Sequence, residues 1–225
     1  MALNLSRGCG NPTGFANLQP GDVVVDFGCG GGIDVILAAR KVGPQGRVVG
    51  IDFTCEMIIR ARQTVAEMGL QDWNIDLRIA AMENTQLPGR FANVIISNCV
   101  INLCPEKEAV YREAFRILRP DGRVAISDIV LLEDIEPELR ARFQSIWVGC
   151  LGGAILADEY FQIVKKVGFS EIQIVAQHIL TSDELAAMAC CPGKDFTPPP
   201  GKEDLMLVVS KVASTKFTAV RPPAN

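Results

Sequence analysis

The stretch VVVDFGCGGGID, Val23 to Asp34, decides the fold of this 225-residue chain. A run of β-branched residues stops at a cluster of glycines, and IDVILAAR then begins a helix. This order predicts a buried strand, a tight turn and a helix. Because ligands of open parallel sheets bind beyond the carboxyl ends of the strands, the glycine turn is a candidate binding loop.

Strands and helices continue to alternate after this first unit. Further strands are expected at 46–52, 75–80, 91–98 and 123–130, and helices at 54–69 and 107–118. Later segments predict a helix over 159–169, a strand over 171–179, a short helix over 182–189 and a last strand over 203–212. No sheet-covering helix separates the last two strands. The pattern predicts an α/β, Rossmann-like, doubly wound sheet of seven strands, mostly parallel with an antiparallel seventh strand.

The composition limits the classes of partner. Hydrophobic residues make up 48% of the chain, the net charge is −4, and no basic block stands out. Nucleic-acid and membrane-surface partners are therefore not expected. The N-terminus lacks the apolar run of a signal peptide, and no stretch has the length of a membrane span, which predicts a cytoplasmic protein.

Eight cysteines are many for such a chain. In a reducing compartment they are thiols, which suit soft ligands. The spacings of structural zinc sites are absent, and the single histidine, His178, is expected to be structural. The cysteines are Cys9, Cys29, Cys55, Cys99, Cys104, Cys150, Cys190 and Cys191.

The glycine loop departs from the dinucleotide-binding pattern. Counted from Gly28, the last small residue of that pattern falls on Ile33, and Asp26 puts a negative charge where a pyrophosphate would bind. A ligand with a cationic end suits Asp26 better, and Asp52 is placed to accept hydrogen bonds from two ribose hydroxyls. The spacings favour S-adenosylmethionine over another nucleotide or a purely structural turn.

The segments VDFGCGGG and GIDFT, with a late antiparallel strand, resemble class I S-adenosylmethionine-dependent methyltransferases over roughly residues 20–212. The resemblance implies S-adenosylmethionine as the cofactor. It assigns the methionine part to Asp26, Gly28 and Gly30, the ribose to Asp52, the adenine end to Met82 and Glu83, and the sulfonium end to Asn98.

Four segments in order, NLSRGCGNP, IISNCVINL, EAFRILRPDGRVAISDIVL and GCLGGA, are similar to arsenite methyltransferases. This resemblance implies that Cys9, Cys99 and Cys150 bind trivalent arsenic and serve as the catalytic set. It implies arsenite or methylarsenite as substrate, and a thiol reductant such as glutathione or thioredoxin. From the residues alone, core packing remains an alternative for any one of these cysteines.

Two other functions remain open from the sequence. One is a class I methyltransferase for a small organic acceptor, which would need a base or a phenol such as Tyr111 or Tyr160. The other is a thiol-rich metalloid-binding protein without activity. The expected parts of the chain are an N-terminal segment 1–19 with Cys9, a cofactor-binding core 20–135, a C-terminal part 136–212 with the acceptor-site cysteine and last strands, and a tail 213–225.

Overall fold

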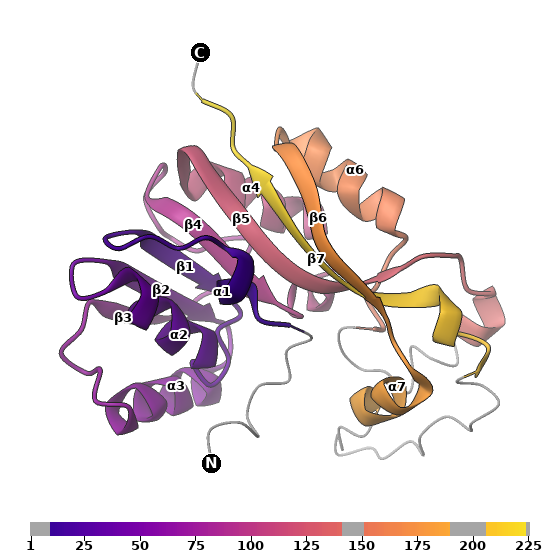
Figure 1. The fold of residues 1–225 in the computed structure, drawn as a ribbon, viewed down its shortest axis with the longest axis horizontal. Coiled ribbons are helices and arrows are strands. Elements are labelled where there is room, and N and C mark those ends of the chain that lie inside the picture. Colours follow the sequence, from indigo (N-terminus) through magenta and orange to yellow (C-terminus); the bar gives the residue numbers. More distant parts are fainter. Residues whose placement is uncertain (1–9, 141–150, 190–205, 224–225) are drawn as a thin grey trace.

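The structure is a computed structural model that describes residues 10–140, 151–189 and 206–223. Figure 1 shows one twisted sheet with helices on both faces. The strands are β1 (Val23–Phe27), β2 (Arg47–Asp52), β3 (Ile75–Ile79), β4 (Ala92–Asn98), β5 (Leu118–Leu131), β6 (Ser170–Ile179) and β7 (Val212–Val220). The helices are α1 (Pro12–Phe15), α2 (Ile33–Val42), α3 (Cys55–Glu67), α4 (Lys107–Ile117), α6 (Ala157–Val167) and α7 (Ser182–Ala189), with 3-10 turns η2 (Ile101–Leu103) and η3 (Val209–Lys211).

The sheet has the order β3-β2-β1-β4-β5-β7-β6. Pairing is parallel from β3 to β5, and β7 is antiparallel to both β5 and β6. The predicted seven-stranded α/β fold with an antiparallel seventh strand is therefore confirmed. The direction of winding changes between β1 and β4, so the loops after these two strands meet at the switch point.

The bounds of the last strand differ from the prediction. Strand β7 covers Val212–Val220 rather than 203–212, so residues 213–220 lie inside the sheet and the expected tail 213–225 is wrong. The apolar residues Met206 and Leu207 are exposed instead. Because β7 has a strand on either side, even its polar residues Ser214 and Thr215 are buried, which hides it from a search for apolar runs.

Two apolar cores cover the two faces of the sheet. Helices α4 and α6 pack on one face through Tyr111, Ile117 and Tyr160. Helices α2 and α3 pack on the other through side chains such as Val35 and Ile58. Side chains alternate along a strand, so Asp26 and Asn98 belong to the α2–α3 face, as Val24 and Ile96 do.

A third apolar cluster lies at the carboxyl end of β5. It brings Cys99 together with Ile129 and Leu131 of β5, Leu151, and Leu185 of α7. Residues from four separate parts of the chain therefore meet beside the end of β4, which fixes the corner that carries Cys99.

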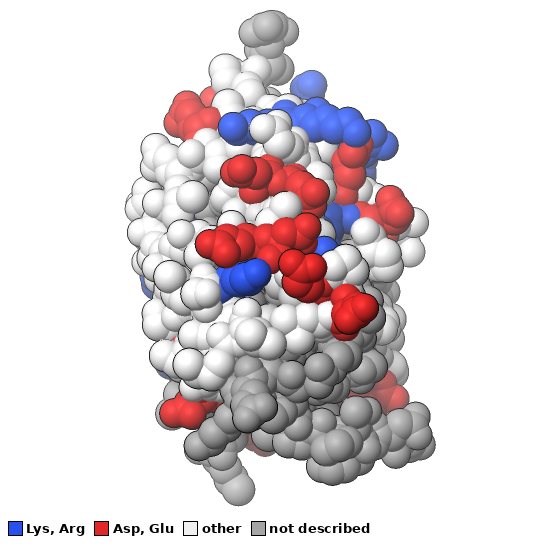
Figure 2. All heavy atoms as spheres, turned by 90° about the vertical axis from the view of Figure 1, so that its right-hand side faces the viewer, with Lys and Arg blue, Asp and Glu red and all other residues white. Residues whose placement is uncertain are grey.

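The surface on the α6 side of the molecule carries a patch of acidic side chains (Figure 2). Figure 2 shows Asp and Glu side chains gathered in the middle of this face, with Lys and Arg at its upper end. Such a face repels anionic partners. No helix in the described parts of the chain combines the length and the apolar character needed to cross a bilayer.

Candidate cofactor and thiol site

The glycine loop between β1 and α2 is closed on one side and open on the other. Gly28 has φ +69, and a Cβ added there would overlap the side chain of Val100. Gly32 has φ +86 and would place a Cβ 3.1 Å from that of Ala61. Gly30 has φ +50, but apart from its own chain neighbours no atom of the described residues lies within 4 Å of the position of its Cβ. The open space above Gly30 is where a ligand could approach the backbone.

Asp52, at the end of β2, shapes this loop. Its Oδ2 accepts a hydrogen bond from the backbone N–H of Gly30 at 3.0 Å. Its Oδ1 accepts one from the N–H of Thr54 at 2.9 Å. Thr54 is the N-cap residue of α3, but its side chain makes no capping hydrogen bond. Asp52 therefore links the loop to the start of α3.

Asp26 lies under the loop with its carboxyl group almost wholly buried, 1% exposed. Its Oδ2 has no hydrogen-bond partner among the described residues. Burial raises the pKa of Asp26 well above its usual range, and the nearby carboxylates of Asp34 and Asp52 raise it further. A buried carboxyl oxygen without a partner is costly, and a cationic group of a ligand would stabilise the charged form.

The carboxamide of Asn98 joins two segments. Its Oδ1 accepts from the Gly10 N–H at 3.2 Å, and its Nδ2 donates to the Gly10 carbonyl at 2.8 Å. Nδ2 also donates to Asp34 Oδ2 at 2.9 Å. Burial raises the pKa of Asp34, and the hydrogen bond from Asn98 opposes this shift. The predicted contact of Asn98 with the sulfonium end stays a prediction, since its amide is occupied by these protein groups.

Met82 and Glu83, expected at the adenine end, follow β3. Met82 is buried in the core on the α4 face, whereas Glu83 is exposed. Glu83 Oε1 lies 3.4 Å from the thiol sulfur of Cys104. Cys104 is itself buried in the same core, as packing predicts.

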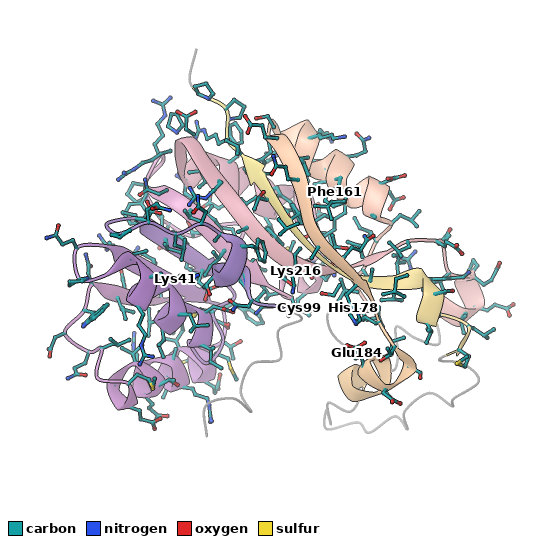
Figure 3. The ribbon with its side chains drawn as sticks, in the orientation of Figure 1. Lys41, Cys99, Phe161, His178, Glu184 and Lys216 are labelled. Carbon is teal, nitrogen blue, oxygen red and sulfur yellow. The ribbon has the colours of Figure 1, made fainter. Side chains whose placement is uncertain are left out.

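Cys99 follows β4 in an unusual backbone conformation. It has φ +59, is 5% exposed, and its N–H donates to the Ser127 carbonyl at 2.7 Å. It is disulfide-bonded in this structure. Figure 3 places Cys99 at the lower edge of the sheet. The other described cysteines, Cys29, Cys55 and Cys104, are free thiols.

Cys9 and Cys150 lie outside the described residues, but the residues that follow them do not. Gly10 is hydrogen-bonded to Asn98, the neighbour of Cys99. Leu151 packs in the same cluster as Cys99. A Cβ added to Gly153 would overlap the carbonyl oxygen of Asn102, so the turn at 151–153 lies directly on the chain after Cys99.

A buried polar network lies on the opposite face of β5 and was missed by the sequence reasoning. Tyr111 donates to Tyr160 Oη at 3.0 Å, and Tyr160 donates to Asp128 Oδ2 at 3.0 Å. Burial raises the pKa of Asp128 to about 7, while the hydrogen bond from Tyr160 and the charge of Lys107 oppose the shift. An aspartate inside the mainly apolar segment ISDIVL was the available signal.

The remaining candidate, His178, takes part in a surface contact. Its Nε2 lies 3.0 Å from the carboxylate of Glu184 near the start of α7, and both side chains are labelled in Figure 3. Within the described ranges no group of three His, Cys, Asp or Glu side chains could hold a metal ion.

The glycine loop, its three carboxylates and the sheet around them match a known family. Residues 18–181 match the family described as "Methyltransferase domain". The chain belongs to this methyltransferase domain family. Its doubly wound sheet with an antiparallel last strand supplies the family's fold.

Among the curated proteins, this chain is similar to arsenite methyltransferases. It is 41% identical over 171 residues to that of Halobacterium salinarum, which covers 76% of this chain and 43% of the relative. It is 30% identical over 165 residues to that of Homo sapiens, which covers 70% of this chain and 44% of the relative. The chain therefore spans about half the length of the curated relatives it matches.

A solved structure shows the same likeness in three dimensions. The arsenic(III) S-adenosylmethionine methyltransferase of Chlamydomonas reinhardtii superimposes with a TM-score of 0.80 at 25% sequence identity. The match covers 99% of this chain and 70% of the other.

Proposed function

We propose that this methyltransferase moves a methyl group from S-adenosylmethionine to trivalent arsenic held by the thiolates of Cys9, Cys99 and Cys150. One observation carries the proposal. Cys99 directly follows Asn98, whose amide reaches Asp34 in the helix that begins at the glycine loop. The proposed sulfur ligand Cys99 and the candidate cofactor loop thus adjoin each other at the switch point.

The loop residues fit this cofactor. The unpartnered oxygen of Asp26 would accept a hydrogen bond from the ammonium of its methionine part. The open space above Gly30 admits the ligand, and Asp52 stands at the end of β2, where a ribose would lie. Met82 and Glu83 are the proposed contacts of the adenine end. The similarity to a Chlamydomonas enzyme named for S-adenosylmethionine supports this set.

The chemistry requires few protein groups. When bound, S-adenosylmethionine supplies a methyl group on a sulfonium cation, and trivalent arsenic offers a lone pair to accept it. No general base is needed, because this nucleophile has no proton to lose. The thiolates replace the hydroxides of arsenite and orient its lone pair, so the catalytic contribution of the chain is proximity and orientation.

A thiol reductant belongs to the proposed reaction. Cys99 is disulfide-bonded in this structure, and a disulfide sulfur cannot bind arsenic as a thiolate. Two equivalents of a thiol such as glutathione, or one dithiol such as reduced thioredoxin, would reduce this bond to two protein thiols and leave as a disulfide.

An organic acceptor is less well supported by the described residues. Tyr111 and Tyr160 are at most 1% exposed. Their hydroxyl groups bond to each other and to Asp128. Neither phenol is free to position an acceptor ring.

Mass spectrometry of the arsenic species formed with arsenite, S-adenosylmethionine and glutathione tests the proposal. Cys99→Ser and Cys150→Ser should each nearly abolish methylation while cofactor binding, measured by calorimetry, is unchanged. Cys29→Ser and Cys104→Ser are the matched controls and should stay close to wild type. Full activity in both ligand variants would disprove the three-thiolate site. Cofactor binding without any methylated arsenic would favour an organic acceptor. The absence of both cofactor binding and methylated arsenic would favour a metalloid-binding protein without activity.

A further inference from the structure

We propose that Asn98 is a positioning residue: its carboxamide fastens the backbone of Gly10 to Asp34 and so sets where the segment that begins after Cys9 meets the glycine loop. The inference rests on the proposed function and assigns Asn98 a role in arsenite capture. It follows from three hydrogen bonds of one side chain, two to Gly10 and one to Asp34.

The backbone of Gly10 packs directly against the sheet beside Asn98. Asn98, Ser127 and Lys216 are neighbours in register across β4, β5 and β7. A Cβ added to Gly10 would overlap Ser127 Oγ and lie 3.0 Å from Lys216 Cε. Only glycine brings its backbone close enough for both hydrogen bonds to Asn98.

The chain after Gly10 is held by other groups. Arg123 donates to the carbonyl of Ala16 at 2.7 Å, and Lys41 donates to that of Thr13 at 2.5 Å. Asn11 caps α1 by accepting from the Gly14 N–H at 3.1 Å. Loss of the Asn98 carboxamide therefore releases Gly10 but leaves α1 in place.

The contact with Asp34 connects this anchor to the cofactor loop. Asp34 is the second residue of α2, which starts at the end of the glycine loop. Its Oδ2 accepts a hydrogen bond from Nδ2 of Asn98, which also donates to the Gly10 carbonyl. One amide thus fixes the spacing between the two segments.

The number of thiolates that each substrate binds distinguishes the positioning role of Asn98 from a general defect. Arsenite can take three thiolates, whereas methylarsenite takes only two. If the Gly10 anchor positions Cys9, its loss should impair arsenite much more than methylarsenite. A general defect of folding would affect both substrates equally.

The experiment compares Asn98→Ala with the control Asn93→Ala in the reduced protein. Asn93 lies in the same strand, and its Oδ1 accepts from the Val23 N–H at 2.9 Å at the opposite end. Asn98→Ala should raise the KM for arsenite at least about tenfold more than the KM for methylarsenite, the factor expected for one or two lost neutral hydrogen bonds. Asn93→Ala should change neither substrate selectively.

An exchange of the two side chains tests the link to Asp34. Asn98→Asp puts a carboxylate against Asp34 and should raise KM for arsenite as Asn98→Ala does. Adding Asp34→Asn restores a donor between positions 34 and 98 and should recover part of the loss. A double variant no better than Asn98→Asp overturns the link.

Amide hydrogen exchange at Gly10 tests its hydrogen bond to Asn98 without relying on catalytic activity. Exchange should be slower in the wild type than in Asn98→Ala, and equal rates overturn the inference even in an active enzyme. Equal effects of Asn98→Ala on both substrates overturn the positioning role alone. A wild-type protein that captures no arsenite, measured by mass spectrometry of the reduced chain, overturns the proposed function and this role with it.

Discussion

Asn102 donates a hydrogen bond from Nδ2 to Asp128 Oδ1 at 3.1 Å and a second to the carbonyl of Ile129 at 2.7 Å. These bonds tie the turn after Cys99 to β5. Gly153 packs directly against the carbonyl group of the same asparagine. The Asn102–Asp128 pair therefore also supports the turn that follows Cys150. Two asparagines, at positions 98 and 102, therefore hold the chain on either side of Cys99.

The buried Asp128 predicts a pH-dependent stability. Its pKa is raised to about 7 in the folded protein, so the folded state holds a proton that the unfolded state releases near pH 4. This contribution to stability is complete below about pH 4 and is lost as pH rises to about 7. Within that range the free energy of unfolding should fall by up to about 1.4 kcal/mol per pH unit.

Asp128→Asn isolates this effect, because asparagine does not titrate and all other groups cancel in the comparison. Urea unfolding at pH 5, 6, 7 and 8 should show the difference between wild type and variant shrinking up to pH 7 and then levelling. A constant difference would mean that Asp128 is charged throughout.

Asp52→Ala should weaken binding of S-adenosylmethionine. It removes the acceptor of the Gly30 and Thr54 N–H groups as well as the proposed ribose contact. Hydrogen bonds to charged groups contribute roughly 1.5–3 kcal/mol, so the dissociation constant from calorimetry should rise at least about tenfold. Asp76→Ala is the control, since Asp76 pairs with Arg47 and Arg78 instead. An unchanged constant in Asp52→Ala would remove Asp52 from the site.

Gly30→Val should abolish cofactor binding in a protein that still folds. The Cβ of the valine would enter the open space above the loop, where no described atom beyond the chain neighbours of Gly30 lies within 4 Å. Gly43→Val is the matched control: Gly43 also has a positive φ, +71, and open space, but lies at the far end of α2. Both variants place a valine at a positive φ, so the difference in calorimetric binding is the measure that counts. Equal binding by the two would refute a ligand site above Gly30.

Gly153→Ala should destabilise the protein and disturb arsenite methylation together. The added methyl group overlaps the Asn102 carbonyl and must push the turn away from the chain after Cys99. Overpacking of this kind costs about 1–3 kcal/mol. In the control, Gly89→Ala, the nearest atom is at 3.5 Å, an ordinary contact. Thermal unfolding and product analysis measure both effects, and a wild-type melting temperature in Gly153→Ala would contradict the close packing.

The sheet and the glycine loop were predictable because local patterns encode them. The β-branched run before Gly28 and the alternation of elements led to the correct fold and to Asp26 and Asp52. The last strand was misplaced because its burial comes from its neighbours β5 and β6, which no local pattern records.

Contacts across the sheet could not be predicted in the same way. The bonds of Asn98 to Gly10 span 88 positions, and the sequence offers no rule that pairs an amide with that backbone. The Tyr111–Tyr160–Asp128 network likewise joins α4, α6 and β5, which come together only in the folded chain.

The left-handed backbone conformation of Cys99 lowers the stability of the fold, whereas the proposed arsenic site requires a cysteine at this position. Such a conformation costs a residue other than glycine about 1–2 kcal/mol, and glycine or asparagine adopts it more easily. A library randomised at this position in a reducing host and selected only for thermal resistance should therefore converge on glycine or asparagine. The same library selected for growth on arsenite should return cysteine, so two selection pressures acting on one codon would enrich different residues.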